Sequence, residues 1–192
     1  EKDPKILEVD IGSIELYKVN GNIIKKRFIN SLGIGFDAKV AYLNQSNKIL
    51  SGSLSYITAI IRAFLKFNLI DFKININGKY LNKSALFCSI GNGESVGGGL
   101  YLMPGAVISD GILDLSIVDL RSRLKLIRLL PKAMNNRLIG VDELEQYRFK
   151  ELEIELQTPY YAHVDGEIVS SETKKVYVQV LSKVLNFMVT RS

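Results

Sequence analysis

The chain has 192 residues, the size of one large domain or two small ones. Hydrophobic residues make up 47% and charged residues 23%, so the chain can bury a core, and a disordered or low-complexity protein is excluded. The 25 Lys and Arg residues exceed the 20 Asp and Glu residues and give a net charge of +5. This charge permits an anionic partner but falls well short of that of a histone-like nucleic-acid binder.

Cysteine and histidine occur once each, as Cys88 and His163. A single cysteine excludes an internal disulfide, and the two residues together are too few for a zinc site of the usual Cys/His kind. A Cys/His/Asp hydrolase triad would need both single copies, and no other feature of the sequence supports one. The longest apolar stretch, around 54–69, contains Arg62 and Lys66 and is too short and too charged to span a membrane.

Strand signals dominate the chain. Asn-Gly and Asp-Gly pairs stand among strand-like runs, and such pairs tolerate the positive φ angles that tight hairpin turns need. Runs of alternating apolar and polar residues, such as 151–156 and 175–180, are typical of half-buried strands. Many short strands with frequent turns predict a mainly β protein, an antiparallel β-sandwich or barrel. The pairs are Asn20-Gly21, Asn77-Gly78, Asp110-Gly111 and Asp165-Gly166.

Two segments have helical spacing instead. The first runs from Leu54 to Leu65, with its apolar residues on one face. The second extends from Arg121 to about Met134, where Pro131 is expected to kink or end the helix. We therefore expect one domain, an antiparallel β-sandwich with two helical insertions. Basic residues of the second segment recur every three or four positions and form one stripe of a helix, which consists of Arg121, Lys125, Arg128 and Lys132.

Two glycine-rich segments could approach a ligand closely. Residues 28–38 form a strand with two glycines near its end, and a tight strand-to-helix turn is the favoured interpretation. A full dinucleotide-binding fingerprint is absent, because Ala38 stands in place of its third glycine. Residues 91–99 contain five glycines, and such a loop can aim N–H groups at phosphate or simply be flexible. The Lys-Ser/Thr ending of a P-loop is missing there.

Two further segments carry carboxylates in turns. Asp110 lies where nearby carbonyls converge and could bind a hard cation such as Mg²⁺, although spacing alone favours an ordinary hairpin turn. Residues 162–167 place Asp165 and Glu167 on either side of a glycine, where either could act as a general base. Two solvated turn carboxylates are the more common outcome of this pattern. His163 is expected to be packed or hydrogen-bonded rather than catalytic.

These four segments, in this order, resemble the C-terminal domain of the bacterial diacylglycerol kinase-like lipid kinases. That family includes sphingosine and ceramide kinases and is more distantly similar to NAD kinases. The resemblance runs from about Asp10 to the C-terminus and implies a two-domain enzyme, whose N-terminal α/β domain carries a Gly-Gly-Asp-Gly-Thr nucleotide motif that is not in this chain. Residues 1–9 would then be the remnant of the connection to that domain, and residues 10–192 the C-terminal β-sandwich domain.

The resemblance also implies roles for single residues in the two carboxylate turns. Glu167 aligns with the family's general base, which takes the proton from the acceptor hydroxyl of the lipid, and Asp165 would orient Glu167 or a water near it. Asp110 aligns with the ligand of a structural Mg²⁺ ion. The backbone carbonyls of Val107 and Ile112 would complete the protein shell of that ion.

The second glycine-rich segment has an implied role as well. Asn92, Gly97 and Gly98 would bind the cofactor, ATP, and the glycines Gly97 to Gly99 would shape the cleft wall that faces the missing domain. The expected function is therefore that of the C-terminal piece of an ATP- and Mg²⁺-dependent lipid kinase, which transfers the γ-phosphate to a lipid hydroxyl such as that of diacylglycerol. Alone, this piece is expected to be inactive, because the missing domain would hold most of the nucleotide.

Other functions stay open at this point. One is a non-catalytic β-sandwich module that binds lipid or protein, and another is an NAD kinase-like domain, although the two helices fit a lipid partner better than a soluble dinucleotide. Nucleic-acid binding is poorly supported by the modest charge and the core-like positions of most aromatic residues. The lack of an initiator Met and of an apolar signal region predicts a piece of a larger cytoplasmic protein. The basic stripe could meet anionic lipid at a membrane surface, and a homodimer is open.

Overall fold

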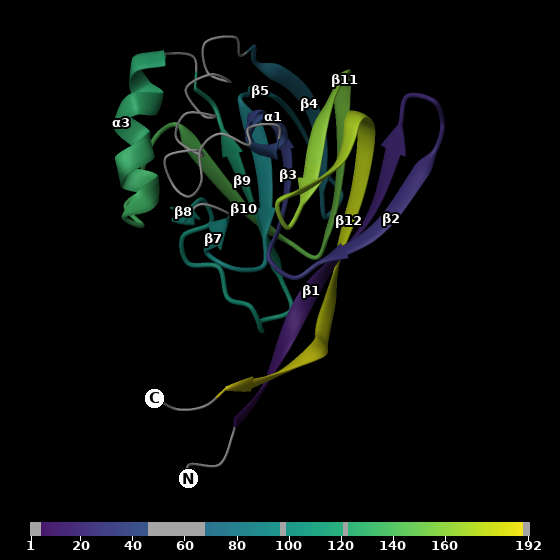
Figure 1. Cartoon of the computed structure of the whole chain (residues 1–192), viewed down its shortest axis with the longest axis vertical. Coiled ribbons are helices and arrows are strands. Elements are labelled where there is room, and N and C mark those ends of the chain that lie inside the picture. The colour runs from purple at the N-terminus through teal and green to yellow at the C-terminus, as the bar shows by residue number, and fades with distance from the viewer. Residues whose placement is uncertain (1–4, 46–67, 97–98, 121–122, 190–192) are drawn as a thin grey trace.

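A computed structural model of the chain describes residues 5–45, 68–96, 99–120 and 123–189. Strands dominate these ranges, and every strand pairing in them is antiparallel (Figure 1). The helices are α1 (Phe36–Gln45) and α3 (Arg123–Met134). The strands are β1 (Lys5–Lys18), β2 (Ile23–Phe28), β3 (Ser31–Gly35), β4 (Ile70–Ile76), β5 (Lys79–Ala85), β6 (Phe87–Gly91), β7 (Ser95–Val96), β8 (Leu100–Tyr101), β9 (Leu113–Val118), β10 (Leu144–Phe149), β11 (Glu151–Val164) and β12 (Glu167–Val189).

A ten-stranded sheet forms the body of the protein. Its main path runs in the order β10-β9-β6-β3-β11-β12-β1-β2, and β4 joins both β11 and β5. The long strand β11 changes its partner along one edge, because residues 162–164 pair with β3 whereas residues 152–156 pair with β4. Pro159, which has no N–H to donate to a neighbouring strand, lies at this change of partner. The sheet thus divides at β11 into two layers.

The main hydrophobic core lies between these layers. Strand β4 shows why the sequence folds this way, since Phe72, Ile74 and Ile76 are buried while Asp71 and Lys73 between them are exposed. A second core covers the outer face of β6 and β9, two strands that are buried on both faces. It includes Phe36 and Val40 of α1, Phe87 of β6, Val118 of β9 and Ala133 of α3.

An ion pair links two of the three end strands of the folded sheet, β5 and β10. Strand β5 ends one branch and β10 ends the main path, and these two strands are not hydrogen-bonded to each other as neighbours. The ammonium of Lys83 on β5 lies 2.6 Å from a carboxylate oxygen of Glu145 on β10. The predicted fold class, a mainly β antiparallel sandwich with helical insertions, is confirmed.

The predicted turns hold at all but one of the Asn-Gly and Asp-Gly pairs. Asn20-Gly21 joins β1 to β2, Asn77-Gly78 joins β4 to β5, and Asp165-Gly166 joins β11 to β12. Positive φ angles of 49° and 87° at the second pair and of 48° and 85° at the third explain these residue types. The hairpin expectation is wrong for Asp110-Gly111, which lies in the long connection between β8 and β9, two strands that do not pair.

One of the predicted helices can be compared with the structure. The segment 54–65 lies outside the described residues. The second segment is present as α3, and Pro131 lies inside it rather than at its end, so Lys132 belongs to the helix. Among the helices in the described ranges, none is long and apolar enough to cross a membrane.

A two-stranded arm projects from the body (Figure 1). It consists of the start of β1 and the end of β12, paired from Lys5 and Val189 at the tip to Val9 and Leu185 at the base. Residues 5–9, predicted to be the remnant of a connection, therefore form one strand of this arm. The position of a domain boundary at residue 10 stays a prediction.

Candidate functional site

The segments singled out in the sequence meet at one end of the sandwich. The N–H of Asn92 donates to the carbonyl of Asn30 at 2.9 Å and joins the β6–β7 loop to the β2–β3 connection. The N–H of Asn30 donates to the carboxylate of Asp165 at 3.0 Å and brings in the β11–β12 turn. The N–H of Asp10 donates to the carbonyl of Ile108 at 2.8 Å, which attaches the β8–β9 loop through β1.

Asp165 anchors the β2–β3 connection. Its carboxylate accepts three backbone N–H groups, those of Ile29 at 3.0 Å, Asn30 at 3.0 Å and Ser31 at 2.8 Å. Hydrogen bonds from backbone N–H groups to a charged carboxylate are stronger than neutral ones, so Asp165 fixes the turn against this connection. These contacts engage the carboxylate with backbone groups, and its predicted role in orienting Glu167 stays a prediction.

Glu167 has the opposite environment. It is the first residue of β12, it is exposed, and its cross-strand neighbour is Val164. Among the residues that the structure describes, no side chain forms a hydrogen bond or an ion pair with its carboxylate. Glu167 is therefore open to solvent, and its predicted role as the general base stays a prediction.

A buried pair of side chains, His163 and Asp37, lies beside the same turn. Nε2 of His163 lies 3.4 Å from Oδ2 of Asp37, and Nδ1 accepts the N–H of Gly166 at 3.3 Å. An imidazole whose Nδ1 accepts a hydrogen bond carries its proton on Nε2, the nitrogen that faces Asp37. A Cβ atom at Gly33 would collide with both side chains, which explains why a glycine stands there. His163 is a hydrogen-bonded structural residue, as the sequence predicted.

The structure argues against a Cys/His/Asp hydrolase. Cys88 is fully buried in the main core. Burial raises the pKa of the Cys88 thiol well above its ordinary value, and the negative charge of Asp37 raises it further. A thiol held protonated in this way is a poor nucleophile.

Asn92 clamps two backbone segments together. It is buried, and its side-chain nitrogen donates to the carbonyls of Asp10 at 2.7 Å and Ile29 at 3.1 Å. Its Oδ1 is buried without a hydrogen-bond partner in the described part of the chain. The predicted contact between Asn92 and a cofactor stays a prediction, and the other two predicted cofactor residues, Gly97 and Gly98, lie outside the described residues.

Sequence reasoning gave no role to Asp10, which is a hub of this region. Its side chain is fully buried, and its two carboxylate oxygens accept the N–H groups of Gly111 at 2.6 Å and Lys183 at 2.7 Å. Lys183 has a positive φ of 53° and lies in a bulge of β12 opposite Asp10. The available sequence signal was a carboxylate between Val9 and Ile11, in an otherwise apolar part of a strand.

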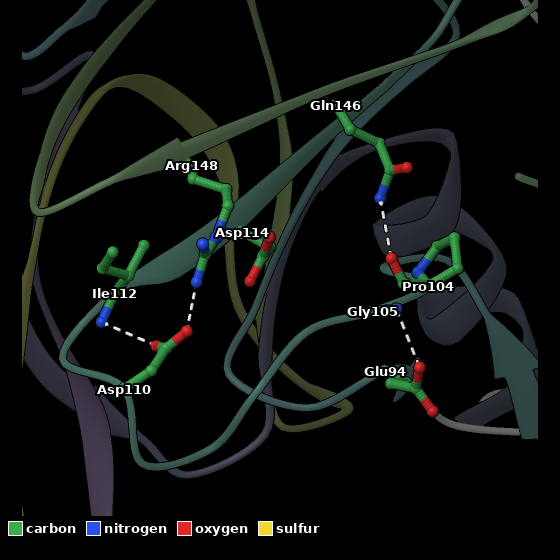
Figure 2. A network of polar contacts seen from close by, with 8 residues as sticks. All are labelled: Glu94, Pro104, Gly105, Asp110, Ile112, Asp114, Gln146 and Arg148. Atoms are coloured by element: carbon green, nitrogen blue, oxygen red, sulfur yellow. Dashed lines mark hydrogen bonds and ion pairs between the residues drawn. The ribbon is translucent and has the colours of Figure 1, made fainter. Parts of the chain in front are cut away.

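The β8–β9 loop is held by Arg148 of β10 (Figure 2). Arg148 forms an ion pair through Nη2 with Oδ2 of Asp110, and its Nε lies 3.7 Å from Oδ1 of Asp114. The other oxygen of Asp110 accepts the N–H of Ile112 at 3.1 Å. Burial raises the pKa of Asp114, while the positive charge of Arg148 acts in the opposite direction.

The other side of the same loop is fixed by neutral and charged hydrogen bonds (Figure 2). The N–H of Gly105 donates to Glu94 at 2.7 Å, and the side-chain nitrogen of Gln146 lies 3.5 Å from the carbonyl of Pro104. Both Gln146 and Arg148 come from β10, so one strand holds both ends of the loop. Neither residue was singled out in the sequence, because the contacts depend on the register of β10.

The magnesium site implied at Asp110 does not fit the residues as they lie. Both carboxylate oxygens of Asp110 are engaged, and one of their partners is a guanidinium, which is itself a cation. Within the described ranges, no group of three or more His, Cys, Asp or Glu side chains could hold a metal ion. The assignment of Val107 and Ile112 as carbonyl ligands stays a prediction that this arrangement does not support.

The fold and these hydrogen bonds define a β-sandwich domain whose predicted site segments meet at one end. The family described as "YegS C-terminal NAD kinase beta sandwich-like domain" matches residues 30–189, and the chain belongs to this family. The resemblance inferred from the four segments is thereby confirmed.

Curated relatives carry names that agree with this family. The chain is 28% identical over 148 residues to a "Diacylglycerol kinase" of Mycobacterium tuberculosis, which covers 77% of this chain and 47% of the relative. It is 29% identical over 170 residues to a "Probable lipid kinase YegS-like" of Pseudomonas fluorescens, covering 88% of this chain and 54% of the relative. The chain thus spans about half the length of these relatives.

Solved structures support the fold. A diacylglycerol kinase from Bacillus anthracis aligns with 95% of this chain and 53% of its own, with a TM-score of 0.61 at 19% identity. A yeast NADH kinase complexed with NADH aligns with 96% of this chain and 44% of its own, with a TM-score of 0.55 at 13% identity. At these identities the likeness concerns the fold alone.

Proposed function

We propose that this chain is the acceptor-side domain of an ATP-dependent lipid kinase. Membership of the family supports the kinase class, and the names of the curated relatives point to a lipid hydroxyl, such as that of diacylglycerol, as the acceptor. The observation that carries the site is the contrast between two carboxylates in one turn. Asp165 is engaged by backbone N–H groups, whereas Glu167 is exposed and available.

Glu167 is the group that accepts the proton of the attacking hydroxyl in this proposal. Phosphoryl transfer depends mostly on positioning and on stabilisation of charge, so a base must be held at a constant place. Asp165 and His163 supply that rigidity, because Asp165 ties the turn before Glu167 to the β2–β3 connection and His163 accepts the N–H of Gly166 within that turn. General-base assistance of this kind contributes about 10²–10⁴ in rate.

ATP is proposed to be held mainly by a domain outside this chain. The curated relatives are about twice as long as the matched segment, which leaves room for such a domain. The amide nitrogen of Asn92 is already bound to backbone carbonyls, so Asn92 would shape the loop toward that domain rather than grip the nucleotide itself. The chain alone is expected to be inactive, and the complete kinase to be cytoplasmic.

The test uses the full-length kinase that contains this chain, with ATP, Mg²⁺ and diacylglycerol in mixed micelles. We expect Glu167→Gln to lower kcat by about 10²–10⁴ without a change in Tm. Glu155→Gln is the matched control, because Glu155 is also an exposed strand carboxylate and lies far along β11 from the turn. Full activity of the Glu167→Gln enzyme would remove Glu167 from the mechanism.

A panel of acceptors separates the alternative functions. Diacylglycerol, a sphingoid base, a polyprenol and NAD⁺ are offered in turn to the same enzyme. Phosphorylation of NAD⁺ alone would favour an NAD kinase-like domain, and phosphorylation of none would favour a non-catalytic binding module. The proposal expects a lipid alcohol to be the acceptor.

The basic stripe of α3 supports a further part of the proposal, contact with an anionic membrane surface. Arg128 and Lys132 are exposed and belong to the helix, whereas Lys125 is paired with Glu143 at 2.6 Å. Arg121 lies outside the described residues. Each free basic residue near an anionic surface contributes about 1 kcal/mol of attraction.

Two exposed apolar side chains follow this basic stripe closely in the sequence. Met134, at the end of α3, is 45% exposed, and Ile139, in the segment that follows, is 75% exposed. Basic and apolar groups together are what an interfacial contact with lipid requires, because the charges draw the surface to the headgroups and the apolar groups enter the boundary layer. A lipid kinase needs such a contact, since its acceptor resides in the bilayer.

A further inference from the structure

We propose that the guanidinium of Arg148 supplies the positive charge that Asp110 and Asp114 require. The β8–β9 loop would therefore fold without a divalent metal ion. The proposal concerns the loop that carries Asp110 and does not depend on the kinase function or on its substrate. It makes Arg148 a positioning residue, which holds the β8–β9 loop through two carboxylates.

The register of the sheet places Arg148 at this point. Arg148 on β10 is the direct cross-strand partner of Asp114 on β9. A long side chain that starts beside Asp114 reaches the preceding turn, where Nη2 meets Oδ2 of Asp110, while its Nε stays 3.7 Å from Asp114. One guanidinium therefore faces both carboxylates from two different nitrogens, as its fork of donors allows (Figure 2).

The exposure of the three side chains argues that the arrangement is more than a surface contact. Asp114 is 9% exposed and Asp110 is 26% exposed, while Arg148 is 54% exposed. Arg148 thus pairs with one largely buried carboxylate, Asp114, and with one that keeps part of its contact with water, Asp110. Asp110 and Asp114 are neighbouring carboxylates, and without a nearby cation their negative charges would repel each other.

The same geometry disfavours a metal ion. Mg²⁺ needs oxygen ligands in near-octahedral positions, and a guanidinium occupies the position beside Oδ2 of Asp110 that such an ion would need. A divalent ion at Asp110 would also lie beside the positive charge of Arg148. Replacing Arg148 by a neutral residue should favour binding of a metal ion. It frees one oxygen of Asp110 and leaves Asp110 and Asp114 without a neighbouring positive charge.

The experiment compares the full chain with Arg148→Gln, Arg148→Gln/Asp110→Asn and the control Arg137→Gln, a change at another exposed arginine. Binding of Mn²⁺ is measured by electron paramagnetic resonance, and Tm is measured with EDTA or with MgCl₂ against KCl of equal ionic strength. We expect the unsubstituted chain and Arg137→Gln to bind no Mn²⁺ and to keep the same Tm in all three solutions.

Arg148→Gln is expected to lower Tm, to bind Mn²⁺, and to regain about 2–4 °C of Tm in MgCl₂. The added Asp110→Asn change should abolish that binding. Arg148→Lys keeps a cation at the position and should stay independent of metal, which tests the proposal even where the Gln variant folds poorly. Binding of one Mn²⁺ ion by the unsubstituted chain, or metal-independent behaviour of a folded Arg148→Gln variant, would overturn the proposal.

Discussion

Asp165 and Ser31 bind each other through two reciprocal hydrogen bonds. The N–H of Ser31 donates to Oδ1 of Asp165 at 2.8 Å, and the N–H of Asp165 donates to the carbonyl of Ser31 at 2.8 Å. The second bond involves only backbone, so the turn and the β2–β3 connection are joined both by the fold and by a side chain. These two bonds give Asp165 a structural role in the turn, whereas the carboxylate of Glu167 is exposed.

The first prediction follows from that separation. Asp165→Ala should lower the free energy of unfolding by about 1–3 kcal/mol, because it leaves three N–H groups without their acceptor. Asp165→Asn should cost less, since Asn also tolerates the φ of 48° and still offers one oxygen. Urea denaturation of the chain measures both changes.

Glu167→Gln provides the contrast in the same assay. It should change the free energy of unfolding by no more than about 0.5 kcal/mol, because Glu167 is exposed. Equal destabilisation by the Asp165 and Glu167 substitutions would contradict the assignment of different roles to the two carboxylates.

A second prediction concerns Asp10 and the base of the arm. Asp10→Asn keeps the shape of the side chain but replaces one acceptor oxygen by an NH₂ group, so one of the N–H groups of Gly111 and Lys183 loses its partner. We expect a loss of about 1–3 kcal/mol of unfolding free energy. Amide hydrogen exchange measured by NMR should accelerate at Gly111 or Lys183 while the amides of β4 keep their protection. Uniform acceleration would mean that Asp10 stabilises the whole fold rather than this junction.

The separations along the chain explain what the sequence could and could not predict. Asn77-Gly78 and Asp165-Gly166 specify turns through their own backbone preferences, so local reasoning found them. Asp10 and Lys183 are 173 positions apart, and their contact exists only because β1 and β12 pair. The pairing of Arg148 with Asp110 similarly requires the β9–β10 register, which no local pattern reveals.

A third prediction concerns the pH dependence of the ion pair between Lys83 on β5 and Glu145 on β10. The hydrogen bond from Lys83, followed by that from Tyr147, lowers the pKa of Glu145 below its ordinary value. The folded state therefore holds this proton less tightly than the unfolded state, and the pair contributes stability above the ordinary Glu pKa of about 4.3. That contribution is lost as the pH falls through the lower pKa of folded Glu145.

Lys83→Met removes the largest cause of this shift. Its unfolding free energy should therefore fall less steeply than that of the unsubstituted chain between about pH 5 and pH 3. The difference should stay within about 0.2–1 kcal/mol, because Glu145 is 40% exposed and solvent screens the pair. Urea titrations across this range provide the measurement, with Lys26→Met on β2 as the control. Parallel curves for the Lys83→Met and unsubstituted chains would contradict the prediction.

The last prediction tests the membrane contact of α3. Arg128→Gln/Lys132→Gln removes two exposed charges, which at about 1 kcal/mol each corresponds to a loss of roughly 30-fold in partitioning to anionic vesicles. Lys26→Gln/Lys79→Gln removes the same amount of charge from β2 and β5. This control should partition to the vesicles much more strongly than the Arg128→Gln/Lys132→Gln variant. Co-sedimentation with vesicles of phosphatidylglycerol and phosphatidylcholine measures both variants, and purely zwitterionic vesicles should bind every variant weakly. Equal losses in the two double variants would show that total charge, rather than the α3 surface, drives the binding.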